Sequence, residues 1–241
     1  MQPDPGRLLN ALGILTPLIG CYDAPEAHPF VPLVASLPDR MTCVFAFYEH
    51  WLKGETLHIT RENFGCAGAG RALCSVNMRS RADLVKFLVD DEGLRASHSL
   101  MEAWLDHGQT YRPEHPHLLI GPMKPDQDSY LKTVTFLVDP DQLSALVIGA
   151  HYHHGPADPA PVIAPFGAGC MQLLTVFDDL SIPQAAIGAT DIAMRQHLPP
   201  SIMAFSVTKP MFAELCALDE KSFLSKPFWK RLIKAREHTH T

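Results

Sequence analysis

The chain has 241 residues, of which 46% are hydrophobic and 19% are charged. This composition is typical of a chain that buries a core, and it excludes intrinsic disorder. The formal net charge of -6 disfavours a nucleic-acid partner, because an acidic surface repels phosphate groups. No stretch approaches the roughly 20 apolar residues of a membrane-spanning helix, so we expect no membrane partner.

The N-terminal segment and the cysteine content predict a cytoplasmic protein. The first apolar run, from Leu8 to Gly20, has no basic region before it and is interrupted by polar residues and proline, unlike a secretory signal. Six cysteines in a chain of this length are too few for a disulfide framework. We therefore expect free thiols, which serve either as core side chains or as functional groups.

In chain order, hydrophobic spacing first predicts an amphipathic helix over Pro5–Leu15 and an extended, proline-interrupted segment over Cys21–Pro38. The segment Thr42–Leu52 is compatible with a helix or with a buried strand. Alternation of apolar residues then predicts a strand at Thr56–Thr60. Two helices follow, the first capped by Ser80 and the second ended by Gly108.

The second half of the chain alternates apolar runs of strand length with capped helices. Asp139 followed by Pro140 is typical of a helix start. Thr208 and Ser225 are expected to cap the last two helices, of which the final one spans 226–236. The expected strands are Leu118–Pro122, Val134–Val138, Ala185–Ala189 and Ile202–Val207, and Cys170–Phe177 is expected to be helical.

Short strands without strict βαβ alternation predict an α+β fold. We expect a single domain over residues 1–241, with a mixed or mainly antiparallel sheet, packed helices and a core at about residues 32–207. A dinucleotide-binding Rossmann fold is disfavoured, because no Gly-x-Gly-x-x-Gly motif follows a predicted strand.

The segment Gly65–Gly70 is the first candidate site, because three glycines surround Cys66. Such a turn can adopt positive φ and expose backbone N–H groups, and a helix is expected to follow from Arg71. A thiol before a helix has a lowered pKa and a larger thiolate fraction. The alternative is a tight packing turn in which Cys66 is a small buried side chain.

The segment Phe166–Cys170 has the same physical character, with Gly169 directly before Cys170 at the start of an apolar helix. Two such cysteines could share a metal ion, a cluster or a redox couple. Cys43 lies in an apolar segment and could reach the same site. Cys74 and Cys216 are expected in the core, and Cys21 cannot be assigned from its extended segment.

A third candidate is the run His151, His153 and His154, which could supply imidazoles to a metal ion. The run follows a predicted helix, where positively charged histidines are favourable in any case. Solvated histidines at a helix end are the alternative, and the sequence leaves the role of these residues open.

The order of these cysteines and glycines resembles a family of uncharacterised bacterial and archaeal proteins, domain of unknown function 169. The resemblance runs from about Pro32 to Val207, and it implies that Cys43, Cys66 and Cys170 occupy recurrent cysteine positions. Some members have a further cysteine before the late strand, where this chain has none between Gln184 and Gly188. Three thiolates plus another ligand are then expected, and the family implies no activity. The resemblance rests on Cys43 before Leu52-Lys53-Gly54-Glu55, on Leu57-His58-Ile59-Thr60 leading to Cys66-Ala67-Gly68-Ala69, on Gly169-Cys170 and on the strand Ile202–Val207.

We expect a cofactor site in which Cys43, Cys66 and Cys170 bind a metal ion or an iron–sulfur cluster, which would allow a redox role. The backbone at Gly68, Gly70 and Gly169 would line the cofactor.

Two alternatives remain open. The first is an enzyme with Cys66 as nucleophile, backbone N–H groups as oxyanion hole and a histidine base, either His58 or one of the three at 151–154. The second is a non-catalytic module that binds an anionic small molecule at the glycine-rich turns. Aromatic residues at Phe228 and Trp229 are compatible with a homodimer.

Overall fold

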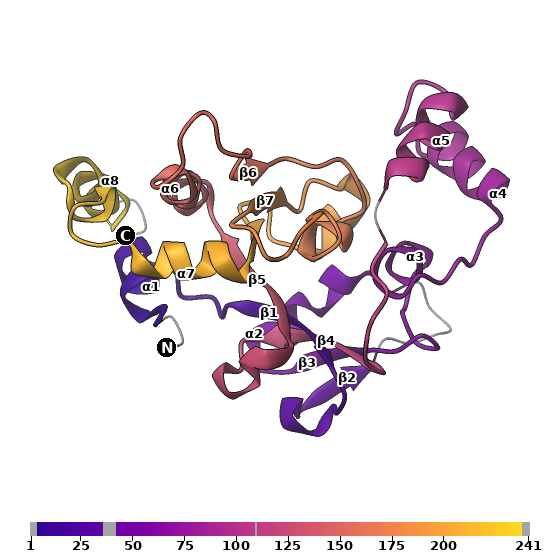
Figure 1. Cartoon of the computed structure of the whole chain (residues 1–241), viewed down its shortest axis with the longest axis horizontal. Helices are drawn as coiled ribbons and strands as arrows, with labels where there is room; N and C mark the ends of the chain where they lie inside the picture. Colours follow the sequence, from indigo (N-terminus) through magenta and orange to yellow (C-terminus); the bar gives the residue numbers. More distant parts are fainter. Residues whose placement is uncertain (1–3, 36–41, 109, 238–241) are drawn as a thin grey trace.

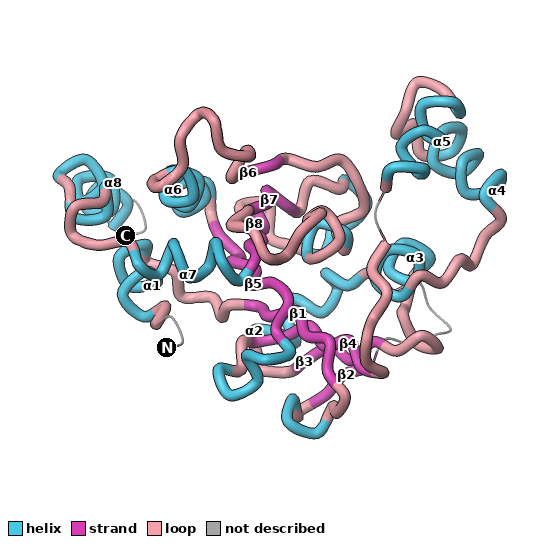
Figure 2. The backbone as a smooth tube through the Cα atoms, in the orientation of Figure 1, coloured by secondary structure: helices cyan, strands magenta, loops and turns pink. Residues whose placement is uncertain are grey.

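The apolar runs of the chain assemble into one eight-stranded sheet with helices on both faces (Figure 1, Figure 2). This computed structural model describes residues 4–35, 42–108 and 110–237. The strands are β1 (Ile19–Ala24), β2 (Leu33–Ala35), β3 (Thr56–Ile59), β4 (His117–Pro122), β5 (Leu131–Val138), β6 (Val162–Ile163), β7 (Ala185–Gly188) and β8 (Met203–Thr208).

The strand order is β2-β3-β4-β1-β5-β8-β7-β6. The pairs β2–β3 and β6–β7 are parallel, and all other neighbouring strands are antiparallel. The expected α+β fold with a mixed, mainly antiparallel sheet is confirmed.

Strands β1 and β5 form the buried centre of the sheet. Every residue of β1 is buried, and in β5 only Lys132 is partly exposed. The extended conformation predicted from Cys21 is confirmed over the end of β1, but the sequence did not identify this segment as a strand that begins at Ile19 and pairs along its length with β4. Its Gly20 and Asp23 interrupt the apolar pattern by which a buried strand is recognised.

Alternating side chains of the strands face two separate hydrophobic clusters. Leu137 faces a cluster that contains Ile120 and residues of α2 and α3, whereas Phe136 faces a cluster that contains Phe205 and residues of α1, α6 and α7. The second cluster extends the packed core beyond the expected range of 32–207. The α-helices are α1 (Gly6–Leu12), α2 (Tyr48–Leu52), α3 (Ala67–Cys74), α4 (Arg81–Lys86), α5 (His98–His107), α6 (Pro140–His151), α7 (Lys209–Ala217) and α8 (Pro227–Glu237).

Short helical turns connect these elements, and several of them lie where the sequence predicts something else. The segment expected to be helical from Cys170 contains only a single 3-10 turn, after which Leu174 leaves helical geometry. The ambiguous segment from Thr42 is helical. The 3-10 turns are η1 (His28–Phe30), η2 (Val44–Phe47), η4 (Pro125–Tyr130), η5 (Met171–Leu173), η6 (Ile192–His197) and η7 (Phe223–Ser225), and η3 (Phe87–Asp91) is a π-helical turn.

Two of the predicted helix caps are confirmed by side-chain hydrogen bonds, one is confirmed in position alone, and one is wrong. Ser80 accepts the N–H of Asp83, and Asp139 forms a capping box at α6. Thr208 occupies the N-cap position of α7, but its hydroxyl donates to the carbonyl of Ile182 and accepts no N–H of the helix. Ser225 lies within η7, two residues before α8 begins.

Helices α4 and α5 form a small lobe beside the main body (upper right in Figure 1). Val85, Met101 and Leu105 are its buried centre. The Arg71 guanidinium of α3 donates to the carbonyl of Leu105, which ties the lobe to the body. None of the helices in the described ranges is both long and apolar enough to cross a membrane.

Candidate functional site

Three cysteines share one local setting, since each precedes a helical turn. Cys43 precedes η2, Cys66 precedes α3 and Cys170 precedes η5. Backbone N–H groups at the start of a helical turn point towards such a residue and favour negative charge on its sulfur. At Cys43 and Cys170 burial outweighs this effect, because the pKa of both thiols is raised.

The Cys66 side chain caps α3 directly. The backbone N–H of Ala69 donates to the Cys66 sulfur at 3.3 Å, and Gly65 before it has a φ of +82°. The helix begins at Ala67, so the prediction of a helix starting at Arg71 was wrong. Gly68 lies in this helix and not in a turn, and the same is true of Gly70.

The glycines beside Cys66 and Cys170 differ in how tightly they are packed. A Cβ atom at Gly68 would lie 3.7 Å from the Cβ of Ala168 and 3.8 Å from the sulfur of Cys66. A Cβ atom at Gly169 would lie 2.8 Å from the side chain of Met194. The glycine at 169 is therefore required by packing beside the cysteines.

The three thiols lie near one another in the folded chain, where they form what we call the cysteine cluster (Cys43, Cys66 and Cys170). Burial raises the pKa of Cys170 well above its ordinary value, and the neighbouring Cys66 and Cys43 raise it further. Burial also raises the pKa of Cys43 to about 11, with smaller contributions from Cys66 and Asp191. The three cysteines therefore lie within electrostatic reach of one another, and the predicted shared cofactor site stays a prediction.

Asp191 is an acidic neighbour of the cluster that sequence reasoning missed. Its carboxylate accepts the N–H of Gly169 at 3.0 Å and that of Ala193 at 3.0 Å, so it joins η6 to the Cys170 segment. It also raises the pKa of Cys170 and Cys43. Its position three residues after β7 was the available signal, since acidic residues after strands cap the next turn.

Gln172 holds the loops around the cluster in place. It is fully buried, and its side-chain amide donates to the Thr190 hydroxyl at 2.6 Å while accepting the Thr190 N–H at 3.3 Å. The same amide donates to the carbonyl of Gly167 at 3.4 Å. These bonds fix the loops that lie before and after Cys170.

The α4–α5 lobe contributes to the edge of this region. Trp104 packs against Phe166 in an edge-on arrangement, and the Arg95 guanidinium lies 3.9 Å from the centre of the same ring. Burial raises the pKa of Glu92, and Asp191 raises it further. Charged groups of both signs therefore surround the Cys170 segment.

The pKa values of the remaining three cysteines show no contribution from another cysteine. Burial raises the pKa of Cys21 to about 12, and the nearby Asp23 adds to the effect. Cys74 is buried in α3, which confirms its predicted core position, and its thiol donates to the Thr60 carbonyl at 3.8 Å. Cys216 is partly exposed and packs against the hydrophobic cluster that contains residues of α6 and α7.

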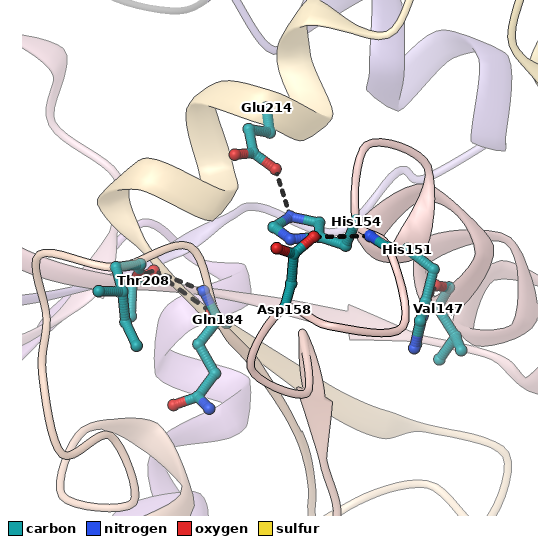
Figure 3. Close-up of polar contacts among 9 residues, drawn as sticks. Val147, His151, His154, Asp158, Gln184, Thr208 and Glu214 are labelled. Atoms are coloured by element: carbon teal, nitrogen blue, oxygen red, sulfur yellow. Dashed lines mark hydrogen bonds and ion pairs between the residues drawn. The ribbon is translucent and has the colours of Figure 1, made fainter.

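The histidines considered as bases have other partners. His58 contacts His117 at 2.9 Å between ring nitrogens, and the ring of His151 bonds to the Val147 carbonyl. His154 is 12% exposed and bonds to Glu214 of α7 at 2.8 Å (Figure 3). His153 packs edge-on against its neighbour Tyr152.

Among the described residues, no three histidine, cysteine, aspartate or glutamate side chains are grouped so that they could hold a metal ion. The sulfurs of the cysteine cluster are thus neighbours without coordination geometry.

The fold and the cluster define an α+β protein whose candidate site consists of one buried and two partly buried thiols before helical turns. Residues 10–217 match the model of DUF169, described as "Uncharacterised ArCR", and the chain belongs to this family. The match extends beyond the range of the resemblance at both ends. No curated protein and no solved structure matches the chain.

Proposed function

We propose that the cysteine cluster binds a thiophilic metal ion or an iron–sulfur cluster through Cys43, Cys66 and Cys170. The observation that carries this proposal is that three free thiols come from separate segments, each directly before a helical turn, and that Cys66 raises the pKa of both Cys43 and Cys170. Thiolates are the preferred ligands of zinc, copper(I) and iron–sulfur clusters.

The raised pKa values support this assignment. A buried thiolate without a cation is costly, so Cys43 and Cys170 stay protonated at neutral pH. A bound cation removes that cost, because each coordinating thiol loses its proton to solvent and the charge is balanced locally. Binding would have to draw the sulfurs closer than they lie in the described structure.

Asp191 is the proposed fourth ligand. It replaces the additional cysteine that this chain lacks before its late strand, and it already adjoins Cys170 and Cys43 through space. An oxygen ligand beside thiolates is compatible with zinc and with iron. Coordination would release the Gly169 N–H, which the carboxylate accepts at 3.0 Å.

The test is anaerobic purification followed by metal analysis and visible absorption. We expect stoichiometric metal in the wild-type chain and its loss in C43S, C66S and C170S. Absorption in the visible range with iron and sulfide would identify a cluster, and colourless protein with zinc would identify a single ion.

C74S and C216S are the matched controls, because these cysteines lie outside the cluster. Both should retain full metal content. Correctly folded protein that is metal-free, that does not take up iron or zinc on reconstitution, and whose stability the cluster substitutions leave unchanged would overturn the proposal.

A second candidate is a nucleophilic role for Cys66, favoured by the N–H that Ala69 donates to its sulfur. The histidines considered as bases have other partners, and Asp191 is an acidic group beside the cluster that could serve instead. Rapid alkylation of Cys66 by iodoacetamide at neutral pH, with no metal bound, would favour this role. We also propose a reducing, cytoplasmic compartment, in keeping with six free cysteines.

A further inference from the structure

A pair of histidines lies on the sheet face opposite to the cysteine cluster. His58 of β3 lies between Leu57 and Ile59, which both belong to the hydrophobic cluster of the cysteines, so its ring points to the other face. His117 of β4 points the same way, since the adjacent Leu118 belongs to that cluster. The sheet therefore separates this pair from the thiols.

The two rings meet through defined nitrogen atoms. Nε2 of His58 lies 2.9 Å from Nδ1 of His117, and the ring centres are 4.9 Å apart at an angle of 51°. Two nitrogen ligands at about 2.0–2.1 Å from one ion, in adjacent right-angled positions, lie about 2.9 Å apart. The observed separation of the two nitrogens matches that requirement, so binding requires the rings to turn out of their mutual hydrogen bond but no change in the distance between the strands.

From this geometry we propose that His58 and His117 form a two-histidine chelate for a divalent transition metal of the nickel and copper type. These ions favour right-angled coordination by imidazole, with water completing the shell. The chelate is independent of the proposed function of the cysteines.

The protonation states fit metal binding. Burial lowers the pKa of His58, and His117 lowers it further, so the His58 ring is neutral at physiological pH. One neutral ring donates its hydrogen to the other in the free protein. On binding, that ring carries its hydrogen on its opposite nitrogen, and each facing nitrogen offers a lone pair to the ion without net loss of a proton.

The site is reachable from solvent. Both histidines are only partly buried, and Ala35 of the edge strand β2, which is in register with His58, is exposed. β2 is the last strand at this end of the sheet.

The test is calorimetric titration of the full chain with Ni²⁺ at pH 7.5. We expect wild-type protein to bind one Ni²⁺ ion. H58Q and H117Q should each bind Ni²⁺ at least about tenfold more weakly. H153Q, which alters an exposed histidine, is the matched control and should bind as wild type does. Titration of C66S should retain the histidine-dependent binding, which keeps this result separate from any nickel bound by thiolates.

A measurement on unmodified protein covers the case in which a variant fails to fold. Paramagnetic broadening by substoichiometric Ni²⁺ should appear first at the imidazole resonances of His58 and His117. Equal affinity in wild type, H58Q and H117Q, or broadening that begins at other histidines, would overturn the proposal.

Discussion

The six cysteines of this chain divide into two groups that differ in their neighbours and resemble each other in burial. Burial is the largest cause of the raised pKa in Cys21, Cys74 and Cys216, and no other cysteine contributes to it. In the cysteine cluster, the thiols of neighbouring cysteines contribute as well. Burial alone makes a thiol inert, whereas several thiols in one place form a potential ligand set.

The first prediction concerns the pH dependence of metal affinity, where the two groups should differ most. Cys43 and Cys170 must lose protons to coordinate, so affinity for Zn²⁺ should rise by about tenfold per pH unit for each proton released, or about a hundredfold per pH unit for both. The measurement is competition with a chelator between about pH 6.5 and 8.5.

C74S should show the same dependence, because Cys74 belongs to the other group. If the wild-type affinity for Zn²⁺ did not change with pH, the thiols with raised pKa values would not be the metal ligands.

The second prediction concerns Gln172, whose hydrogen bonds hold the loops around the cysteine cluster in place. Gln172→Ala should lower the free energy of unfolding by about 2–4 kcal/mol, since it leaves Thr190 unpaired and opens a cavity. Chemical denaturation measures this change. Gln196→Ala is the control, because that exposed amide bonds only to the Ala193 carbonyl, and it should change stability by less than about 0.5 kcal/mol.

The third prediction compares alanine substitutions at two glycines of α3. One should destabilise the protein and the other should stabilise it. A Cβ atom at Gly70 would lie 2.7 Å from the Phe64 ring, so Gly70→Ala should destabilise by about 1–3 kcal/mol. Gly68→Ala makes only ordinary contacts and gains helix propensity, so it should stabilise by up to about 1 kcal/mol. Thermal unfolding of both variants checks the contrast, which equal effects would contradict.

The smallest expected effect is on thiol reactivity inside the cluster. Cys66→Ser removes a group that raises the pKa of Cys43, so alkylation of Cys43 should begin at lower pH. Mass spectrometry of iodoacetamide-treated protein follows each cysteine separately. Cys21 is the internal reference, because its pKa responds to burial, Asp23 and Lys132 and should not shift. A parallel shift at both positions would indicate general loosening of the core.

The two aromatic residues expected to be compatible with a homodimer, Phe228 and Trp229, differ in their exposure. Phe228 is 80% exposed, whereas Trp229 is buried and donates its ring N–H to the Ala11 carbonyl at 2.7 Å. Periodicity in the final helix could not separate them, since neighbouring positions of a helix end on different sides according to what packs against it.

Local chemistry in the sequence was sufficient for several elements. The Asp139-Pro140 start of α6 and the Ser80 cap of α4 depend on bonds within three residues, so they were predictable. The strands β3, β4, β5, β7 and β8 followed from apolar runs to within a few residues. The central strand β1 did not, since its polar and glycine residues are buried by partners far along the chain.

By itself, the sequence determined which cysteines sit beside glycines and before helical turns, because those properties are local. Only the tertiary structure decided that Cys43, Cys66 and Cys170 become neighbours, that Asp191 joins them, and that His58 meets His117 across two strands. The physical reason is that such contacts depend on strand pairing and close packing between distant segments. The spacing of residues in the sequence does not say how far apart such segments lie in space.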